Sequence, residues 1–169
     1  MKRLSQVFQT DMNTSKITDI DFSMFPENIK GILLDTDGTY THLGSNYVIP
    51  EYCSWIQETG KRYPLLSITC NHERKNLDDL IPLIGHRPVQ RQMIEHPKSF
   101  FRRAAKMIDC EPNQVAVIND SLIMLGLFVR PLGCFTVKVN TINYKTEHTL
   151  VGYAYHLGQW IEKKIILHH

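Results

Sequence analysis

An apolar run at residues 31–35 ends in one carboxylate, Asp35, and a second carboxylate, Asp37, follows two residues later. This pattern limits the possible folds of the chain more than any other feature of the sequence. The run reads Gly-Ile-Leu-Leu-Asp and continues as Thr-Asp-Gly-Thr. An apolar run of this length predicts a strand buried on both faces, which is typical of a parallel sheet. Side chains two residues apart in a strand point the same way, so Asp35 and Asp37 can converge at its carboxyl end. Ligands bind at this end of the strands in open α/β sheets, and Gly38 permits the sharp turn that follows.

The rest of the chain alternates similar apolar runs with helical patterns. This alternation predicts a three-layer, Rossmann-like α/β fold with a mostly parallel sheet and crossover helices. Further strands are expected at 63–68, 88–91, 115–118 and 134–139, and helices at 50–60, 73–83, 97–107 and 122–128. Residues 1–25 are expected to form a loosely structured lead-in, and residues 148–167 an amphipathic helix. A length of 169 residues is sufficient for one domain, 1–169, with a single core.

Composition and charge exclude several classes of protein. The formal net charge is +2 without a run of like charges, so no nucleic-acid partner is indicated. The N-terminus lacks a secretory signal pattern, and the longest apolar run, 122–129, is far shorter than the roughly twenty residues of a membrane span. We therefore expect a cytoplasmic protein whose C-terminal helix docks on the sheet, a reading favoured over peripheral membrane contact. The four cysteines lack metal-ligand spacing and are expected to be reduced thiols.

The two carboxylates at positions 35 and 37 are the strongest chemical signal. Two like charges so close together are unfavourable unless a cation or a shared proton compensates, and Mg²⁺ prefers such oxygen ligands. One carboxylate can attack phosphorus to give an aspartyl-phosphate, and the other can protonate the leaving oxygen and then activate water. The alternative is an acidic strand end that caps a helix or binds water, which does not account for the Gly and Thr that follow.

The segment 35–39 resembles the first signature of the haloacid dehalogenase (HAD) superfamily, DxDGT. By that resemblance Asp35 is the nucleophile and Asp37 the acid/base, and the protein is a Mg²⁺-dependent phosphatase. The second signature is a Ser or Thr that closes the next strand and holds the phosphoryl group, which implicates Thr69. The fourth signature places a metal-binding acid after a later strand, which implicates Asp120. The implied protein ligands of Mg²⁺ are Asp35, the backbone carbonyl of Asp37, and Asp120.

The chain is similar, more narrowly, to the YqeG family of HAD subfamily IIIA, whose eukaryotic relatives include the mitochondrial phosphatidylglycerophosphate phosphatase. The similarity covers almost the whole length. It depends on residues 30–31 before the first expected strand, 71–74 after Thr69, 101–104 in the third expected helix, and the spacing from Asp120 to Gly133. Arg74 and Lys75 lie at the expected start of a helix, where they attract an anionic substrate or are merely solvated.

The sequence departs from the family pattern at two motifs. A lysine before a proline normally supplies the cation beside the phosphate, whereas this chain has His96-Pro97, so Lys98 is the expected substitute. In the fourth motif Asn119 replaces a glycine, which is tolerable where the backbone is left-handed because Asn adopts that conformation readily. Leu125 stands where a second acid is expected, and loss of such an outer partner typically costs 10- to 100-fold in activity or metal affinity.

The spacing of the motifs leaves no room for a cap domain. Between Thr39 and Thr69, and again between Thr69 and His96, the chain is long enough only for a helix with its loops or a short strand. An open site favours a phosphate on a bulky substrate, such as a lipid headgroup, a protein or an oligosaccharide. Two other classes are considered: a non-catalytic binding or assembly module that keeps the fold, and a two-component receiver domain. The receiver domain is disfavoured because the strand ending near Thr69 carries no Asp.

Overall fold

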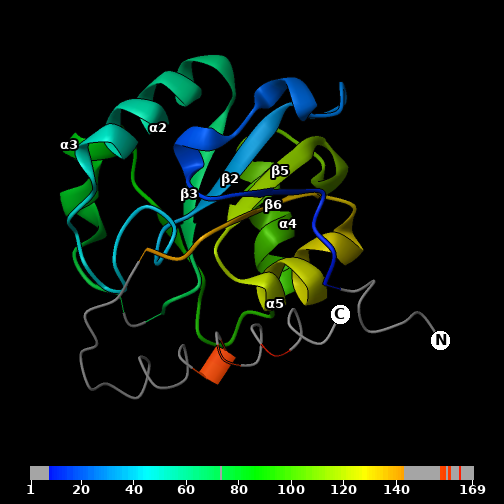
Figure 1. The fold of residues 1–169 in the computed structure, drawn as a ribbon. Coiled ribbons are helices and arrows are strands. Elements are labelled where there is room, and N and C mark those ends of the chain that lie inside the picture. Colours follow the sequence, from blue (N-terminus) through cyan, green and yellow to red (C-terminus); the bar gives the residue numbers. More distant parts are fainter. Residues whose placement is uncertain (1–7, 73, 143–156, 159, 161–163, 165–169) are drawn as a thin grey trace.

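The computed structural model describes residues 8–72, 74–142, 157, 158, 160 and 164 (Figure 1). Its centre is a single sheet in which all six strands run parallel, in the order β1-β6-β5-β2-β3-β4. The strands are β1 Met12–Thr14, β2 Gly31–Asp35, β3 Leu65–Thr69, β4 Val89–Gln90, β5 Val115–Asn119 and β6 Phe135–Val139. The predicted α/β class is therefore confirmed, with an architecture consistent with a Rossmann-like fold.

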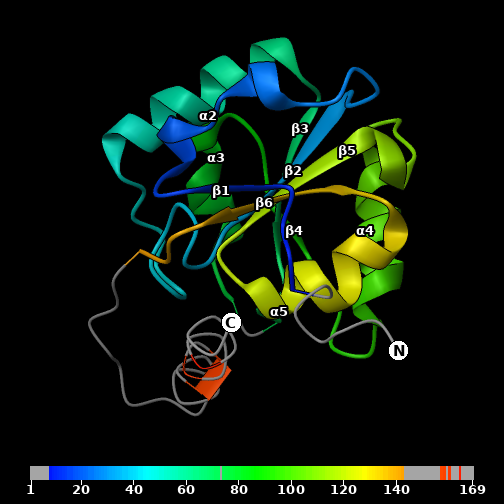
Figure 2. The same ribbon diagram turned by 45° about the vertical axis from the view of Figure 1, so that its right-hand side comes forward.

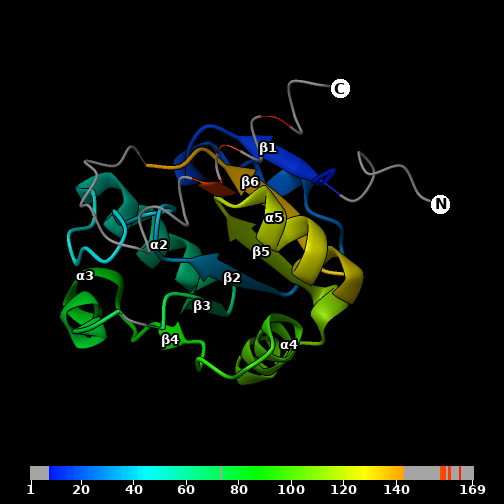
Figure 3. The ribbon, with the colours of Figure 1, turned by 90° about the horizontal axis from the view of Figure 1, so that it is seen from below.

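Four α-helices cover the two faces of this sheet in the described part of the chain. They are α2 Pro50–Arg62, α3 Ile81–Ile84, α4 Pro97–Met107 and α5 Leu122–Met124. Figure 3 shows α2 and α3 on one side of the sheet and α4 and α5 on the other. Figure 2 shows the same layers in a view turned by 45° from that of Figure 1. None of these helices combines the length and apolar character needed to cross a bilayer.

Strand β2 separates two hydrophobic cores because its side chains alternate between the faces. Ile32 and Leu34 lie in the core beneath α2, whereas Leu33 lies in the core that contains Phe100 and Phe101 of α4. All five residues of β2 are buried, as expected for a central parallel strand. The carboxyl end of β2 is consequently held in place by packing on both sides.

Local sequence signals explain where the longer helices begin. Pro50 and Pro97 occupy the first turns of α2 and α4, where a missing N–H costs nothing. His96 caps α4 through its ring Nδ1, which accepts from the Lys98 N–H at 3.2 Å. The helices predicted at 50–60 and 97–107 are accordingly present as α2 and α4, within two residues of their expected bounds.

Two segments differ from their predictions, and a third is mostly not described. The expected helix 73–83 is a 3₁₀ turn, Leu77–Leu80, followed by the short α3, because Asn76 adopts a left-handed φ of 56° that interrupts a helix. The expected helix 122–128 begins as α5 and continues as a π-helical turn, Leu125–Val129. The expected amphipathic helix 148–167 lies mostly outside the described residues.

The lead-in contributes a strand that the sequence does not predict. Within 1–25, β1 pairs in parallel with the outer edge of β6, Met12 opposite Val137. The adjoining carboxylate of Asp11 accepts from the N–H and the hydroxyl of Thr136, at 2.8 and 2.7 Å. Phe22 and Phe25 of the same segment pack on the sheet and α2, with Phe22 stacked on Trp55 and Phe25 against Phe135.

Candidate active site

Four of the five residues predicted to carry chemistry meet at one edge of the sheet. Asp35 ends β2, Thr69 ends β3, Asp37 follows β2, and Asp120 follows β5. The register pairs Asp35 with Ile68 of β3 and places β2 between β3 and β5, so these carboxyl ends lie side by side. All four residues are buried. The exposed fractions of Asp35, Asp37 and Asp120 are 6%, 7% and 2%. The three acids and the hydroxyl therefore lie at the same edge of the sheet, and the roles assigned to them remain predictions.

The carboxylate of Asp35 has an electrostatically unfavourable surrounding. Burial raises its pKa well above the usual value, and the nearby charges of Asp120 and Asp37 raise it further. The opposing contributions are smaller: Thr39 donates its hydroxyl to Oδ2 at 3.2 Å, and the Thr36 backbone also bonds to the carboxylate. A cation beside Asp35 would therefore stabilise the ionised form that a nucleophile requires.

Asp37 is held by three donors from three different segments. Thr69 donates its hydroxyl to Oδ2 at 2.6 Å, the Gly44 N–H donates to Oδ1 at 2.8 Å, and the Arg74 guanidinium forms an ion pair with Oδ1. The turn that brings Asp37 back toward β3 is made by Gly38, whose φ is 81°. Asp37 and Thr69 are thereby bonded to each other in this arrangement.

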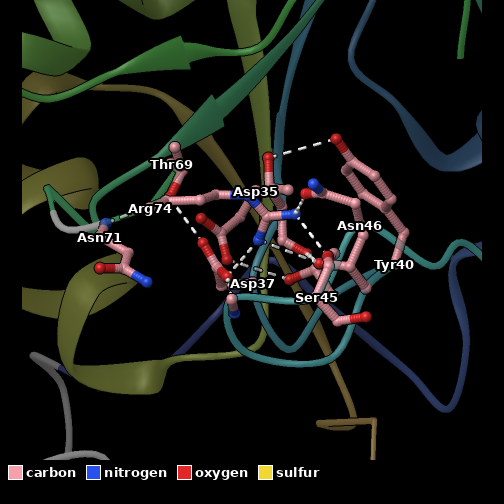
Figure 4. Close-up of polar contacts among 12 residues, drawn as sticks. Asp35, Asp37, Tyr40, Ser45, Asn46, Thr69, Asn71 and Arg74 are labelled. Atoms are coloured by element: carbon pink, nitrogen blue, oxygen red, sulfur yellow. Dashed lines mark hydrogen bonds and ion pairs between the residues drawn. The ribbon is translucent and has the colours of Figure 1, made fainter. Parts of the chain in front are cut away.

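Arg74 is a site residue whose role the sequence does not predict. Its side chain is completely buried, and besides Asp37 it donates from Nη2 to the carbonyl of Ser45 at 2.6 Å and to Asn46 Oδ1 at 3.3 Å. Figure 4 shows the guanidinium lying between Asp37 and these two loop residues. It therefore fastens the loop after β2 to the loop after β3. The signal available in the sequence is its position within the 71–74 similarity, near three clustered acids; the neighbouring Lys75 is exposed.

A buried tyrosine braces the same loop from the other side. Thr36 donates its hydroxyl to the carbonyl of Ile68 at 2.7 Å, and the Tyr40 hydroxyl lies 3.2 Å from the Thr36 hydroxyl oxygen (Figure 4). Burial raises the pKa of Tyr40 to about 12. Tyr40 is consequently a neutral packing and bonding group that fixes the backbone between Asp35 and Asp37.

Lys98 is not joined to the acids among the residues that the structure describes. It lies half-buried in the first turn of α4, and its ammonium forms no ion pair with Asp35, Asp37 or Asp120 there. The neighbouring His96 is exposed, caps α4 and packs edge-on against Phe128 at 6.0 Å between ring centroids. The catalytic role of Lys98 remains a prediction.

Residues 119 and 125, where the sequence departs from the pattern that the resemblance implies, both have a structural explanation. Asn119 ends β5 outside the left-handed region, so the backbone reason expected for Asn there is wrong. Instead its buried amide oxygen accepts from the Ser121 N–H at 2.6 Å and shapes the turn that presents Asp120. Leu125 is completely buried in the core beneath α4 and begins the π-helical turn. Packing, rather than metal chemistry, accounts for Leu125.

The donor set suits Mg²⁺. Asp35 and Asp120 are buried acids close enough for Asp120 to raise the pKa of Asp35, and a divalent cation between such carboxylates would offset that repulsion. Within the described residues, no three His, Cys, Asp or Glu side chains are placed together as a metal-binding group. The predicted ligands include only two such side chains, together with the carbonyl of Asp37, so this finding does not bear on them.

Comparison with known proteins adds no relative to these observations. The chain matches no family model, no curated protein and no solved structure.

Proposed function

We propose that this chain is a phosphohydrolase of the HAD type, related to the YqeG family, which hydrolyses a phosphomonoester with Mg²⁺. The observation that carries the proposal is the position of Asp35 at the carboxyl end of the central strand, buried and faced by the acids Asp37 and Asp120. Three neighbouring buried carboxylates are costly at a purely structural strand end, whereas a nucleophilic carboxylate and a bound metal ion would account for them.

In the proposed reaction a carboxylate oxygen of Asp35 attacks phosphorus, and the bond from phosphorus to the leaving oxygen breaks. In this scheme Asp37 enters the reaction in its protonated form and gives that oxygen its proton, which leaves Asp37 as a carboxylate. Asp37 then takes a proton from the water that attacks the aspartyl-phosphate, which releases phosphate and restores Asp35. Mg²⁺ held by Asp35, Asp120 and the carbonyl of Asp37 would neutralise the negative charge that gathers between enzyme and phosphate.

The contacts of Asp37 add a requirement to this scheme. All its described partners donate to the carboxylate: Gly44, Thr69 and Arg74. Asp37 can reach a leaving oxygen only by exchanging one of these partners for the substrate. Thr69 is the natural one to exchange, because its hydroxyl is also the group expected to hold the phosphoryl oxygen.

We propose that the substrate is bulky, because no cap domain stands over this edge in the described chain. Between β2 and β3 the structure has only loops and α2, and between β3 and α4 only a 3₁₀ turn, α3 and β4, residue 73 lying outside the description. Comparing turnover of a free sugar phosphate with that of phosphatidylglycerophosphate tests this. Efficient turnover of the sugar phosphate alone would contradict it.

The deciding experiment measures hydrolysis of an aryl phosphate and of phosphatidylglycerophosphate with and without Mg²⁺, for the native chain and for Asp35→Asn. We expect metal-dependent hydrolysis that the substitution abolishes, because an amide is too weak a nucleophile. Asp19→Asn, which removes an exposed carboxylate that is not one of the three clustered acids, is the matched control. Unchanged activity in Asp35→Asn would refute Asp35 as the nucleophile.

A non-catalytic binding or assembly module is the second candidate. It is favoured by the mutual bond of Asp37 and Thr69 and by the burial of Leu125 where an acid is expected. This reading predicts that the native chain forms no beryllofluoride adduct at Asp35. A tight, Mg²⁺-dependent adduct would contradict it.

A further inference from the structure

A second arginine lies at the same edge of the sheet, outside the motifs discussed so far. Arg91 directly follows β4, and its N–H donates to the carbonyl of Thr69 at 2.9 Å. This bond continues the ladder between β3 and β4 beyond the last paired residues. The backbone of Arg91 is therefore fixed next to the residue expected to hold the phosphoryl group.

The strand register places Arg91 on the same face of the sheet as Asp35. Asp35 pairs with Ile68, and Ile68 pairs with Val89. Two residues further along these last two strands stand Cys70 and Arg91. Paired residues, and residues two apart, share a face of a sheet, so Asp35, Cys70 and Arg91 project from the face that α4 covers.

The Cys70 thiol interacts electrostatically with both Asp35 and Arg91. Burial raises its pKa to about 12, the charge of Asp35 raises it as well, and the guanidinium of Arg91 acts in the opposite direction. Cys70 thus lies within short range of both charged groups. Since neighbouring strands are about 4.8 Å apart, β2 and β4 are separated by only about 10 Å, a gap that an arginine side chain and one bound anion can fill.

The guanidinium of Arg91 is anchored but keeps donors to spare. Its Nη1 donates to the carbonyls of Glu95 at 2.6 Å and Gln92 at 3.4 Å, and the guanidinium also bonds to the Cys70 side chain. Its Nε is buried and has no hydrogen-bond partner in the described structure. The carboxylate of Glu95 is occupied by Arg103, at 3.0 and 2.8 Å. Among the described residues, no carboxylate forms an ion pair with Arg91. A buried N–H without an acceptor is costly, so an acceptor from outside the chain would stabilise Arg91 in this position.

We propose that Arg91 binds the phosphate of the substrate beside Asp35, in place of Lys98. The inference rests on the proposed phosphatase function and names the cation of that site. The Nε of Arg74 also lacks a partner in the described structure, but its charge is paired with Asp37 and its terminal nitrogens are engaged by Asp37 and the loop after β2, so Arg74 is unsuitable for this task. A guanidinium presents paired donors that match phosphate oxygens, so an anchored arginine selects a phosphate more strictly than a flexible lysine does.

The test is a calorimetric titration of inorganic phosphate, in the presence of Mg²⁺, into the native chain and four variants. The variants are Arg91→Met, Arg91→Lys, Lys98→Met and Arg102→Met. We expect Arg91→Met to weaken phosphate binding at least about tenfold, as for loss of a charge-assisted hydrogen bond. Arg91→Lys should recover part of that loss. Arg102→Met removes an exposed arginine from α4 and should leave the affinity unchanged.

Three results would overturn the assignment. They are an affinity for phosphate in Arg91→Met within twofold of the native value, a larger loss in Lys98→Met than in Arg91→Met, and no phosphate binding by the native chain. A purely structural Arg91 would lower the melting temperature without changing phosphate affinity. The titration does not need turnover, so a failure of the phosphatase proposal, read from Asp35→Asn, is distinguishable from a failure here.

Discussion

Replacing Arg74 by Met should destabilise the fold far more than replacing an exposed arginine. The substitution keeps most of the aliphatic volume but removes the charge that faces Asp37, whose side chain is 8% exposed, while that of Arg74 is 0% exposed. It also leaves the carbonyl of Ser45 without the donor at 2.6 Å. The consequence is an uncompensated buried carboxylate in the middle of the site.

The magnitude follows from the burial of both partners. Breaking a buried ion pair by removing one partner costs about 3–5 kcal/mol. For a chain of this size each kcal/mol lowers the melting temperature by about 2–4 °C, so we expect a fall of about 6–20 °C. The matched control is Arg103→Met, whose partner pair with Glu95 is partly exposed, at 40% and 15%, and whose loss should cost about 1 kcal/mol or less.

The assay is urea unfolding of the native chain, Arg74→Met, Asp37→Asn and the double variant. Because removing both charges leaves none unpaired, the double variant should be more stable than the sum of the single effects predicts. A coupling energy below about 0.5 kcal/mol, the range expected of independent sites, would refute the idea that Arg74 and Asp37 act as a pair.

His86 and two glycines give the remaining predictions. The ring Nε2 of His86 accepts from the Ser67 N–H at 3.0 Å, and burial lowers the His86 pKa, opposed by a backbone hydrogen bond to Ile84. As the pH drops, His86 therefore takes up its proton in the unfolded chain before it does so in the folded one. The free energy of unfolding should fall below about pH 6.5, by up to about 1.4 kcal/mol per pH unit, until the pH reaches the lowered pKa of the folded state. Urea unfolding at several pH values should show this loss relative to His86→Gln, and parallel pH profiles for the two proteins would contradict it. Gly31→Ala places a Cβ 2.7 Å from Ile108 Cδ1 and should cost about 1–3 kcal/mol, whereas Gly60→Ala in α2 meets nothing within 4 Å and should gain up to about 1 kcal/mol. Equal thermal stability of these two variants would show that the space around Gly31 is not limiting.

The parts of the fold that the sequence predicts are those in which pattern and packing agree. Strand β2 is apolar throughout and buried throughout, so its bounds were predictable to the residue. Strand β1 was not predictable, because only Met12 of its three residues is apolar and the strand depends on a partner 125 residues away, through contacts such as those of Asp11 with Thr136.

The candidate site was predictable where a motif defines it and not where a loop completes it. The clustering of Asp35, Asp37 and Asp120 follows from strands that end at one edge of a parallel sheet. The burial of Arg74 depends on the path of the loop after β2, which brings the carbonyl of Ser45 to the guanidinium. No periodicity encodes that path, so the sequence leaves Arg74 open between a residue that attracts an anion and a solvated surface residue.

The two outermost strands of the sheet have a consequence for how the chain behaves among its own copies. Strand β1 has three residues and β4 has two, whereas the four strands between them have five each. A long, flat outer strand would offer a template for edge-to-edge aggregation, and such short ones offer little. Strand β4 pairs only with Ile68 and Thr69 of β3 and does not extend to Ser67. The His86 imidazole instead accepts the hydrogen bond from the Ser67 N–H. Loss of that imidazole would expose part of a five-residue strand, so we expect variants at position 86 to aggregate during refolding at concentrations at which the native chain remains monodisperse.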